Sequence, residues 1–190
     1  MVFDELHSPF TELAFETESG TLIARKVSRG IELDFPMNEP VPTTPPPELL
    51  VALAIDHVED AAYSATTQKL VLHLADERAV RAVRPDFAAL LAIRVQPAVR
   101  GIIVTARGTG DYDIVSRYFA PWVGVNEDPV TGSAHTVLAP YWAKRLGKDE
   151  LVAYQASARG GVLRVRVDRA KRRVHLTGTA VVVAQGALRL

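Results

Sequence analysis

The sequence predicts an α+β fold that is rich in antiparallel strands and has one long central helix. Short segments that alternate apolar and polar residues, such as residues 31–35, recur along the chain. This alternation is typical of half-buried strands. Residues 133–146 are the best helical segment, and the segments that follow them are strand-like. Together these observations favour one central helix surrounded by strands.

The first forty residues are expected to form mainly strands. Residues 13–17 and 21–27 are strand-like, and Glu18-Ser19-Gly20 between them is typical of a hairpin turn. Residues 31–35 form a third strand, which Pro36 ends. Residues 2–6 are expected to be a short helical end.

A proline-rich segment follows the third strand. Residues 36–47 contain six prolines, and a segment of this composition is extended and stiff. We therefore expect a domain boundary here, with residues 1–38 in one unit and residues 39–190 in the other.

The middle of the chain mixes short helices with strands. Helices are expected at residues 46–55, 76–83 and 86–91. The first is entered through prolines, which the first turn of a helix tolerates. Strands are expected at residues 61–64, 69–74, 101–106 and 113–119.

The long helix at residues 133–146 has a clear stop signal. Gly147 follows it, and Lys144 and Arg145 suit the negative end of the helix dipole. Pro140 is expected to kink or divide the helix, because proline has no backbone N–H. Four strands should follow, at residues 152–156, 162–167, 173–177 and 180–184.

Composition excludes several classes of function. The 22 basic and 22 acidic residues balance, which argues against a general nucleic-acid-binding or membrane-binding surface. The absence of cysteine excludes disulfides and thiolate sites. No apolar run approaches the roughly 18 residues that a membrane helix needs, and residues 1–10 do not resemble a secretory signal. We expect a cytoplasmic protein with no nucleic-acid partner and no membrane partner.

Basic residues concentrate in one place, between Arg164 and Arg173. They lie on an alternating segment and a turn, so we interpret them as a solvated hairpin. Histidines are scattered, without the spacing of metal ligands on one helix face, and we predict no metal site. His57 and His73 are interpreted as surface or satisfied core groups. His175 should face the opposite side from Val174 and Leu176.

One short motif carries the chemistry: Glu127-Asp128-Pro129-Val130-Thr131-Gly132-Ser133-Ala134-His135. Asp128-Pro129 sets a rigid bend, after which the long helix begins. The first N–H groups of a helix have no partner within it and carry about half a positive charge. Such an end binds carboxylate or phosphate, and we expect this one to hold a small anion.

An ordinary helix cap is the alternative interpretation. Thr131 or Ser133 could cap the helix, with Glu127 and Asp128 merely suiting its dipole. An aromatic stretch before the motif, Tyr118, Phe119, Pro121 and Trp122, favours a functional interpretation, because it could form the apolar wall of a small pocket.

Two stretches together resemble the phenazine-biosynthesis PhzF-like family: residues 116–125, Ser-Arg-Tyr-Phe-Ala-Pro-Trp-Val-Gly-Val, and the motif at residues 127–135. Further similarity is found at residues 17–22, 32–36, 159–161 and 178–183. The resemblance therefore covers essentially the whole chain.

The resemblance implies a diaminopimelate-epimerase-like fold, in which two halves each wrap a β-barrel around a central helix. It implies proton transfer at carbon without a cofactor, on a small carboxylated metabolite bound between the halves. By resemblance, Asp128 and Ser133 are the catalytic residues. Thr131, Gly132, Ala134 and His135 are expected to help bind the substrate, although His135 equally fits a packed or surface residue.

The sequence also departs from the family's pattern. The family's principal acid/base is a glutamate in a Ser-Glu-Thr context, and a Gly-His-Ala-Thr motif supplies a histidine; neither occurs here. We therefore expect residues 1–38 to be the remnant of the N-terminal half and residues 39–190 to be a complete C-terminal half. A start error in the gene model, an engineered fragment and a natural short form are all open.

Three functions follow from this pattern. The first is a PhzF-like isomerase or epimerase, which is inactive as this chain if the missing acid/base group is essential. The second is a non-catalytic module that binds a small anion, and the third is an interaction domain in which the motif only caps a helix. Exposed edges of residues 13–35 should pair with another chain, so we expect a homodimer or higher self-association.

Overall fold

The computed structural model describes residues 10–17, 20–184 and 186, and these form a single large sheet with four α-helices. The predicted helical end at residues 2–6 lies outside the described residues. The strands are β1 (Glu12–Thr17), β2 (Gly20–Val27), β3 (Gly30–Pro36), β4 (Val41–Pro42), β5 (Asp60–Ser64), β6 (Lys69–His73), β7 (Gly101–Arg107), β8 (Ile114–Ala120), β9 (Val125–Glu127), β10 (Glu150–Gln155), β11 (Gly161–Asp168) and β12 (Arg173–Gly178). The helices are α1 (Pro47–Ala52), α2 (Glu77–Ala82), α3 (Phe87–Ala92), α4 (Gly132–Leu146) and the 3-10 turn η1 (Pro121–Val123).

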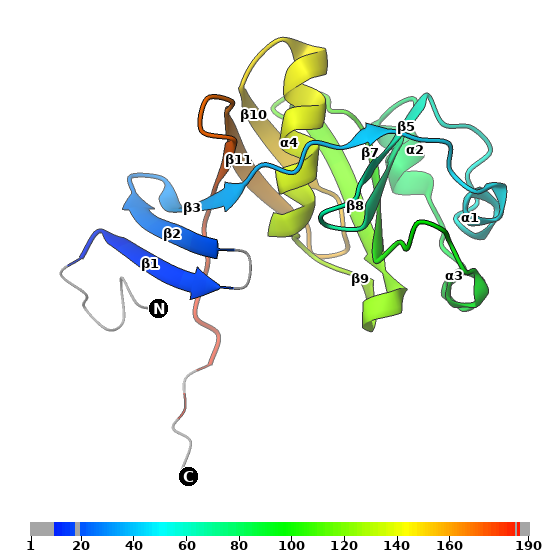
Figure 1. The fold of residues 1–190 in the computed structure, drawn as a ribbon, viewed down its shortest axis with the longest axis horizontal. Helices are drawn as coiled ribbons and strands as arrows, with labels where there is room; N and C mark the ends of the chain where they lie inside the picture. Colours follow the sequence, from blue (N-terminus) through cyan, green and yellow to red (C-terminus); the bar gives the residue numbers. More distant parts are fainter. Residues whose placement is uncertain (1–9, 18–19, 185, 187–190) are drawn as a thin grey trace.

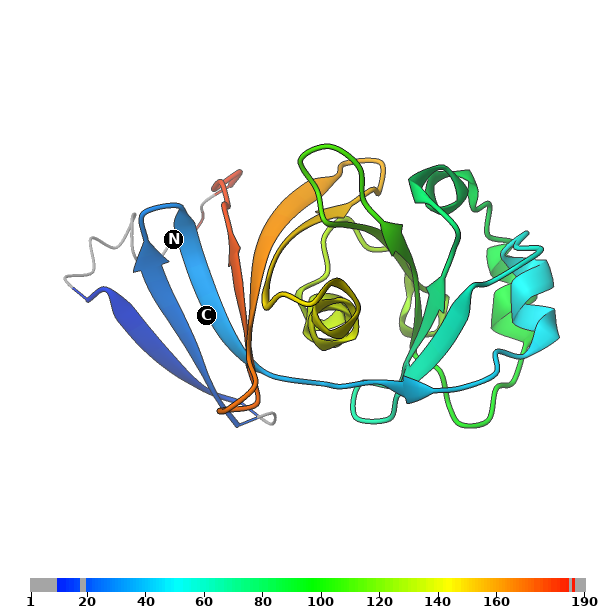
Figure 2. The same cartoon turned by 90° about the horizontal axis from the view of Figure 1, so that it is seen from above.

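The sheet is open, so the prediction of a closed barrel is wrong. Its strand order is β1-β2-β3-β12-β11-β10-β8-β7-β6-β5-β4, with β9 added beside β8. Closure would require β1 to pair with β4, and these strands form opposite ends of the order (Figure 1). β4 has only two residues, and one of them, Pro42, has no N–H to donate to a ladder. The sheet instead curves around α4 (Figure 2).

Most predicted elements are present, and the last predicted strand is not. Asp76 and Asp86 accept hydrogen bonds from the N–H groups of Ala79 and Ala89, which fixes the starts of α2 and α3. Residues 180–184 are outside any strand, with Val181 and Val183 83% and 91% exposed. β12 already has β3 and β11 on its two sides, so the sheet offers no edge there for another strand.

Pro140 does not divide α4, which is a continuous helix of 15 residues. Proline leaves the carbonyl group four residues earlier without its helical donor, and here that carbonyl belongs to Thr136. The N–H of Asn38 donates to the Thr136 oxygen at 3.2 Å, and its Nδ2 donates to Thr136 Oγ1 at 2.9 Å. The proline-rich segment therefore completes the helix. Gly147 ends it in a left-handed conformation, φ 67°.

Two apolar cores lie on the two faces of the sheet. The concave face packs on α4 through residues such as Val71, Ile103 and Leu176. The convex face of β5–β8 packs beneath α1, α2 and α3 through residues such as Leu72 and Phe119. β3 pairs with β12, so the two predicted units share one sheet; the boundary at residues 36–47 stays a prediction.

Candidate functional site

The site is built at the start of α4, where the chain arrives from β9. Asp128 follows β9, and its N–H donates to the carbonyl oxygen of Tyr118 at 3.1 Å. Thr131 is the N-cap residue and has an extended backbone, φ −115° and ψ 102°. Gly132 is the first residue of the helix, so Ser133 lies within the first turn. Neither hydroxyl makes a capping hydrogen bond to the helix.

Gln155 holds the bend at residues 128–131, which precedes α4. Its side chain is fully buried at the end of β10. Oε1 accepts the N–H of Thr131 at 2.9 Å, while Nε2 donates to the Asp128 carbonyl oxygen at 2.6 Å and to Thr131 Oγ1 at 3.1 Å. The Gln155 amide therefore holds the bend before the helix and leaves the N–H groups of the first helical turn uncapped.

The turn between β10 and β11 supports the same bend. Ser157 Oγ donates to the carbonyl oxygen of Pro129 at 2.8 Å. Val130 packs against Gly161 so closely that a Cβ at that position would lie 2.3 Å from Val130 Cγ2. Gly160 has a φ of +70°, which favours glycine. The glycine pair thus lets the bend lie directly on the sheet.

The two acids of the motif have different environments. Glu127 forms a two-pronged ion pair with Arg117, at 2.8 and 3.0 Å, and Arg117 also donates to the Val83 carbonyl oxygen. Asp128 is half-buried, and its Oδ2 accepts the Thr131 hydroxyl at 2.5 Å. Glu127 is thus committed to holding β8 and β9 together, whereas Asp128 is oriented at the helix start.

Three N–H groups at the start of α4 donate to no acceptor among the described residues: those of Gly132, Ser133 and Ala134. Gly132 is half-buried, Ser133 is exposed, and Ala134 is buried beneath them. Together with the helix dipole, such groups attract an anion. The arrangement can therefore hold a carboxylate beside the Asp128 side chain.

His135 lies one turn into α4 and is completely buried. Its Nδ1 lies 2.8 Å from the carbonyl oxygen of Thr131, so this nitrogen carries the proton and donates it. Nε2 has no hydrogen-bond partner among the described residues. Burial lowers the pKa of His135, and the ring is therefore neutral at pH 7. The ring packs beneath the helix start, and its expected part in substrate binding stays a prediction.

Acid should destabilise the protein through buried histidine. Burial lowers the pKa of His73, His135 and His175 in the folded state, whereas histidine in an unfolded chain titrates near about 6.5. The unfolded state therefore binds more protons below that pH, and the free energy of unfolding should fall as pH drops from 7 to 5.5. His135→Leu should flatten this dependence by about 1 kcal/mol over that range in urea titrations. His57→Leu, on an exposed side chain, is the matched control; an unchanged slope in His135→Leu would contradict the argument.

The aromatic stretch does not form the expected pocket wall. Phe119 and Trp122 pack in the core beneath α1–α3, on the other face of the sheet from Tyr118. Side chains of successive strand residues point to opposite faces, so this stretch could not line one pocket. Tyr118 stays near the site: burial, and then the charge of Asp128, raises the pKa of its hydroxyl.

Two expectations are confirmed, one about His175 and one about the basic segment. His175 lies on the opposite face from Val174 and Leu176, which pack on α4. The basic segment forms the β11–β12 hairpin. Among the described residues, no cluster of His, Asp and Glu could hold a metal ion. Over the same part of the chain, every helix is too short or too polar to cross a bilayer.

Sequence reasoning missed Gln155 and Arg117, which hold the two acids in place. Both lie on strands, where nothing local distinguishes them from other polar residues. The available signal for Gln155 was its place on the same strand face as Leu151 and Ala153, where a buried amide requires partners.

Comparison with known proteins shows what the chain is similar to. Residues 2–186 match the family described as phenazine biosynthesis-like protein. An uncharacterized isomerase of Pseudomonas aeruginosa is 46% identical over 190 residues, which cover all of this chain and 69% of the relative. The crystal structure of a PhzF-family phenazine biosynthesis protein from Enterococcus faecalis has a TM-score of 0.88 and 39% identity, with 100% of this chain and 69% of that chain covered. A predicted epimerase from P. aeruginosa, with a TM-score of 0.64 and 16% identity, covers 97% of this chain and 71% of that one and shares the fold.

Proposed function

This chain belongs to the phenazine biosynthesis-like (PhzF-like) protein family, and on that premise we propose that it takes part in cofactor-independent proton transfer at a carbon atom of a small carboxylated metabolite. One observation carries the proposal: the half-buried Asp128 carboxylate is fixed beside a helix start whose N–H groups are unpaired among the described residues. A proton-transfer group thus lies next to an anion-binding group.

The residues divide between binding and proton transfer. The N–H groups of Gly132, Ser133 and Ala134, with the Ser133 hydroxyl, bind the substrate carboxylate. Asp128 accepts or donates the proton at the adjacent carbon, which requires hydrogen-bond reach and a fixed geometry. Thr131 and Gln155 supply that geometry. His135 is buried, so it supports the helix start from beneath.

Turnover by this chain alone is proposed to be slow. The resemblance assigns the principal acid/base to a glutamate in a Ser-Glu-Thr context, which this sequence does not contain. A proton-transfer site usually needs one group on each face of the reacting carbon. The same observation favours a second candidate function, a module that binds a small carboxylate without converting it.

Hydrogen exchange distinguishes the two functions. The chain is incubated in deuterated water with small 2-amino and 2-hydroxy carboxylates, and loss of the C2 proton is followed by NMR. Catalysed exchange supports the isomerase, and saturable binding without exchange supports the binding module. Absence of both would overturn both proposals and leave an interaction domain.

Self-association is proposed through the outer edge of β1. β1 ends the strand order and pairs only with β2 among the described strands; Phe15 on it is 46% exposed, and Leu33 on β3 is 38% exposed. Exposed strand edges recruit further strands. Light scattering should show a mass above that of the monomer, and Phe15→Lys should lower it. Val51→Lys, which changes an 80% exposed residue on α1, is the control. A monomer in dilute wild-type samples would rule the contact out.

A further inference from the structure

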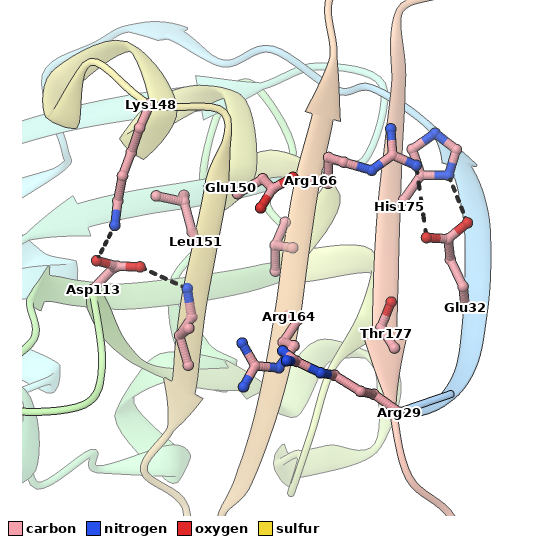
Figure 3. A pocket seen from close by; sticks show the side chains of 12 residues that line it. Arg29, Glu32, Asp113, Lys148, Glu150, Leu151, Arg164, Arg166, His175 and Thr177 are labelled. Carbon is pink, nitrogen blue, oxygen red and sulfur yellow. Dashed lines mark hydrogen bonds and ion pairs between the residues drawn. The ribbon is translucent and has the colours of Figure 1, made fainter. Parts of the chain in front are cut away.

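A cavity lies on the convex face of the sheet, away from the start of α4. α1, α2 and α3 cover this face over β5–β8, whereas over β10, β11, β12 and β3 it carries a polar cavity of about 320 Å³ (Figure 3). This volume lies at the lower end of the roughly 300–1,000 Å³ usual for small-molecule sites. The proposed function makes no use of it.

Strand register places the charged residues of this cavity in two rows. Arg164, Thr177 and Glu32 are neighbours across β11, β12 and β3. Glu150 and Arg166 form the next row, together with His175. Side chains in one row of a sheet lie within contact distance of their neighbours. The rows therefore show which charged side chains can pair with one another.

Two of the three carboxylates are already neutralised. Asp113 pairs with Lys148 and accepts the N–H of Val152 at 2.7 Å. Glu32 lies 3.6 Å from Arg166 and 3.3 Å from His175 Nδ1. Glu150 has no ion pair among the described residues, and it lies in the row of Arg166.

Two arginines remain without a counter-charge. Neither Arg29 nor Arg164 forms an ion pair or a side-chain hydrogen bond within the described part of the chain, and both line the cavity. Figure 3 shows both side chains at the same end of the cavity, and Thr177 lies beside Arg164 on the neighbouring strand β12. The Thr177 hydroxyl also has no hydrogen-bond partner among the described residues. Two guanidinium groups that share one end of a cavity repel each other unless an anion joins them.

We propose that this cavity binds a phosphate group, either free or as the monoester of a small molecule. Guanidinium groups present paired N–H donors that match phosphate oxygens, and the Thr177 hydroxyl adds a third donor. Two cations suit a dianion better than a single carboxylate. The Glu150 carboxylate in the next row repels the anion. Removing its charge should therefore strengthen binding, whereas removing an arginine should weaken it.

Calorimetric titration with inorganic phosphate and with glycerol phosphate tests the site. Wild type should bind saturably, and the tighter of the two probes identifies the free ion or the ester as the preferred form. Arg164→Gln and Arg29→Gln should each weaken binding by about tenfold or more. Glu150→Gln should tighten binding, because it removes a negative charge. Arg94→Gln, an exposed arginine outside this cavity, should bind like wild type.

The start of α4 could also attract phosphate, and the variants separate the two sites. Binding in the sheet cavity should weaken in Arg164→Gln and Arg29→Gln and should shift the ring resonances of His175 in NMR spectra, whereas binding at the start of α4 should do neither. Phosphate binding that is unchanged in both arginine variants, or no saturable binding by wild type, would overturn the proposal. Either result would have no bearing on the proposed proton transfer, which is tested separately by hydrogen exchange at carbon in deuterated water.

Discussion

Asp128→Asn should lower the rate of carbon–proton exchange toward the uncatalysed background, a loss of about 10²–10⁴-fold where a single acid/base group is removed. Asparagine has nearly the same shape, and its amide oxygen can still accept the Thr131 hydroxyl that now donates to Asp128 at 2.5 Å. It cannot take up a proton. Binding of the carboxylate should therefore persist while exchange is lost, and NMR in deuterated water measures both.

Two variants serve as controls for this experiment. Ser133→Ala should weaken substrate binding and change the free energy of unfolding by less than about 0.5 kcal/mol, because the Ser133 side chain is exposed and does not cap the helix. Glu127→Gln should lower stability through its ion pair with Arg117 without a large change in exchange. An exchange rate in Asp128→Asn equal to that of wild type would remove Asp128 from the mechanism.

Gln155→Met should lower the free energy of unfolding by about 2–4 kcal/mol, because it leaves the Thr131 N–H and the Asp128 carbonyl oxygen without partners at the base of the site. Methionine has a similar volume, so packing changes little and the loss reports the hydrogen bonds. Urea unfolding at pH 7 measures it. The same variant should weaken carboxylate binding, since the bend before α4 loses its support.

Gln155→Glu provides a sharper comparison. A glutamate keeps an acceptor for the Thr131 N–H and loses the donor to the Asp128 carbonyl oxygen. Burial raises the pKa of such a carboxyl group, so this variant should be least stable at high pH and recover part of its stability as pH falls toward 5. Stability equal to wild type in both variants would show that the amide is not needed.

Local patterns predicted the elements that depend on local chemistry. α4 could be predicted because Gly147 stops it and its start carries a recognisable motif. β3 could be predicted because residues 31–35 alternate. α2 and α3 begin at Asp76 and Asp86, whose carboxylates cap them. Each of these features depends only on residues that are close together in the sequence.

Long-range features could not be predicted in this way. Whether the sheet closes depends on whether its two end strands, β1 and β4, can meet, and no local pattern encodes that. The failed strand at residues 180–184 has the composition of a strand but finds no free edge in the described sheet. Gln155 and Asp128 are joined by a hydrogen bond across 27 residues, and the two arginines of the convex cavity come from β11 and from the turn between β2 and β3.

The bond between Asn38 and Thr136 gives the proline-rich segment an additional meaning. A linker of this composition would ordinarily act as a spacer that lets its two sides move. Here its backbone supplies the donor that Pro140 cannot, across 98 residues of sequence. The segment can move away only if Thr136 loses its hydrogen bonds to Asn38, close to the anion-binding end of α4. The segment is therefore fastened to α4. A substitution that weakens either the segment or the helix should lower the hydrogen-exchange protection of backbone amides in the other.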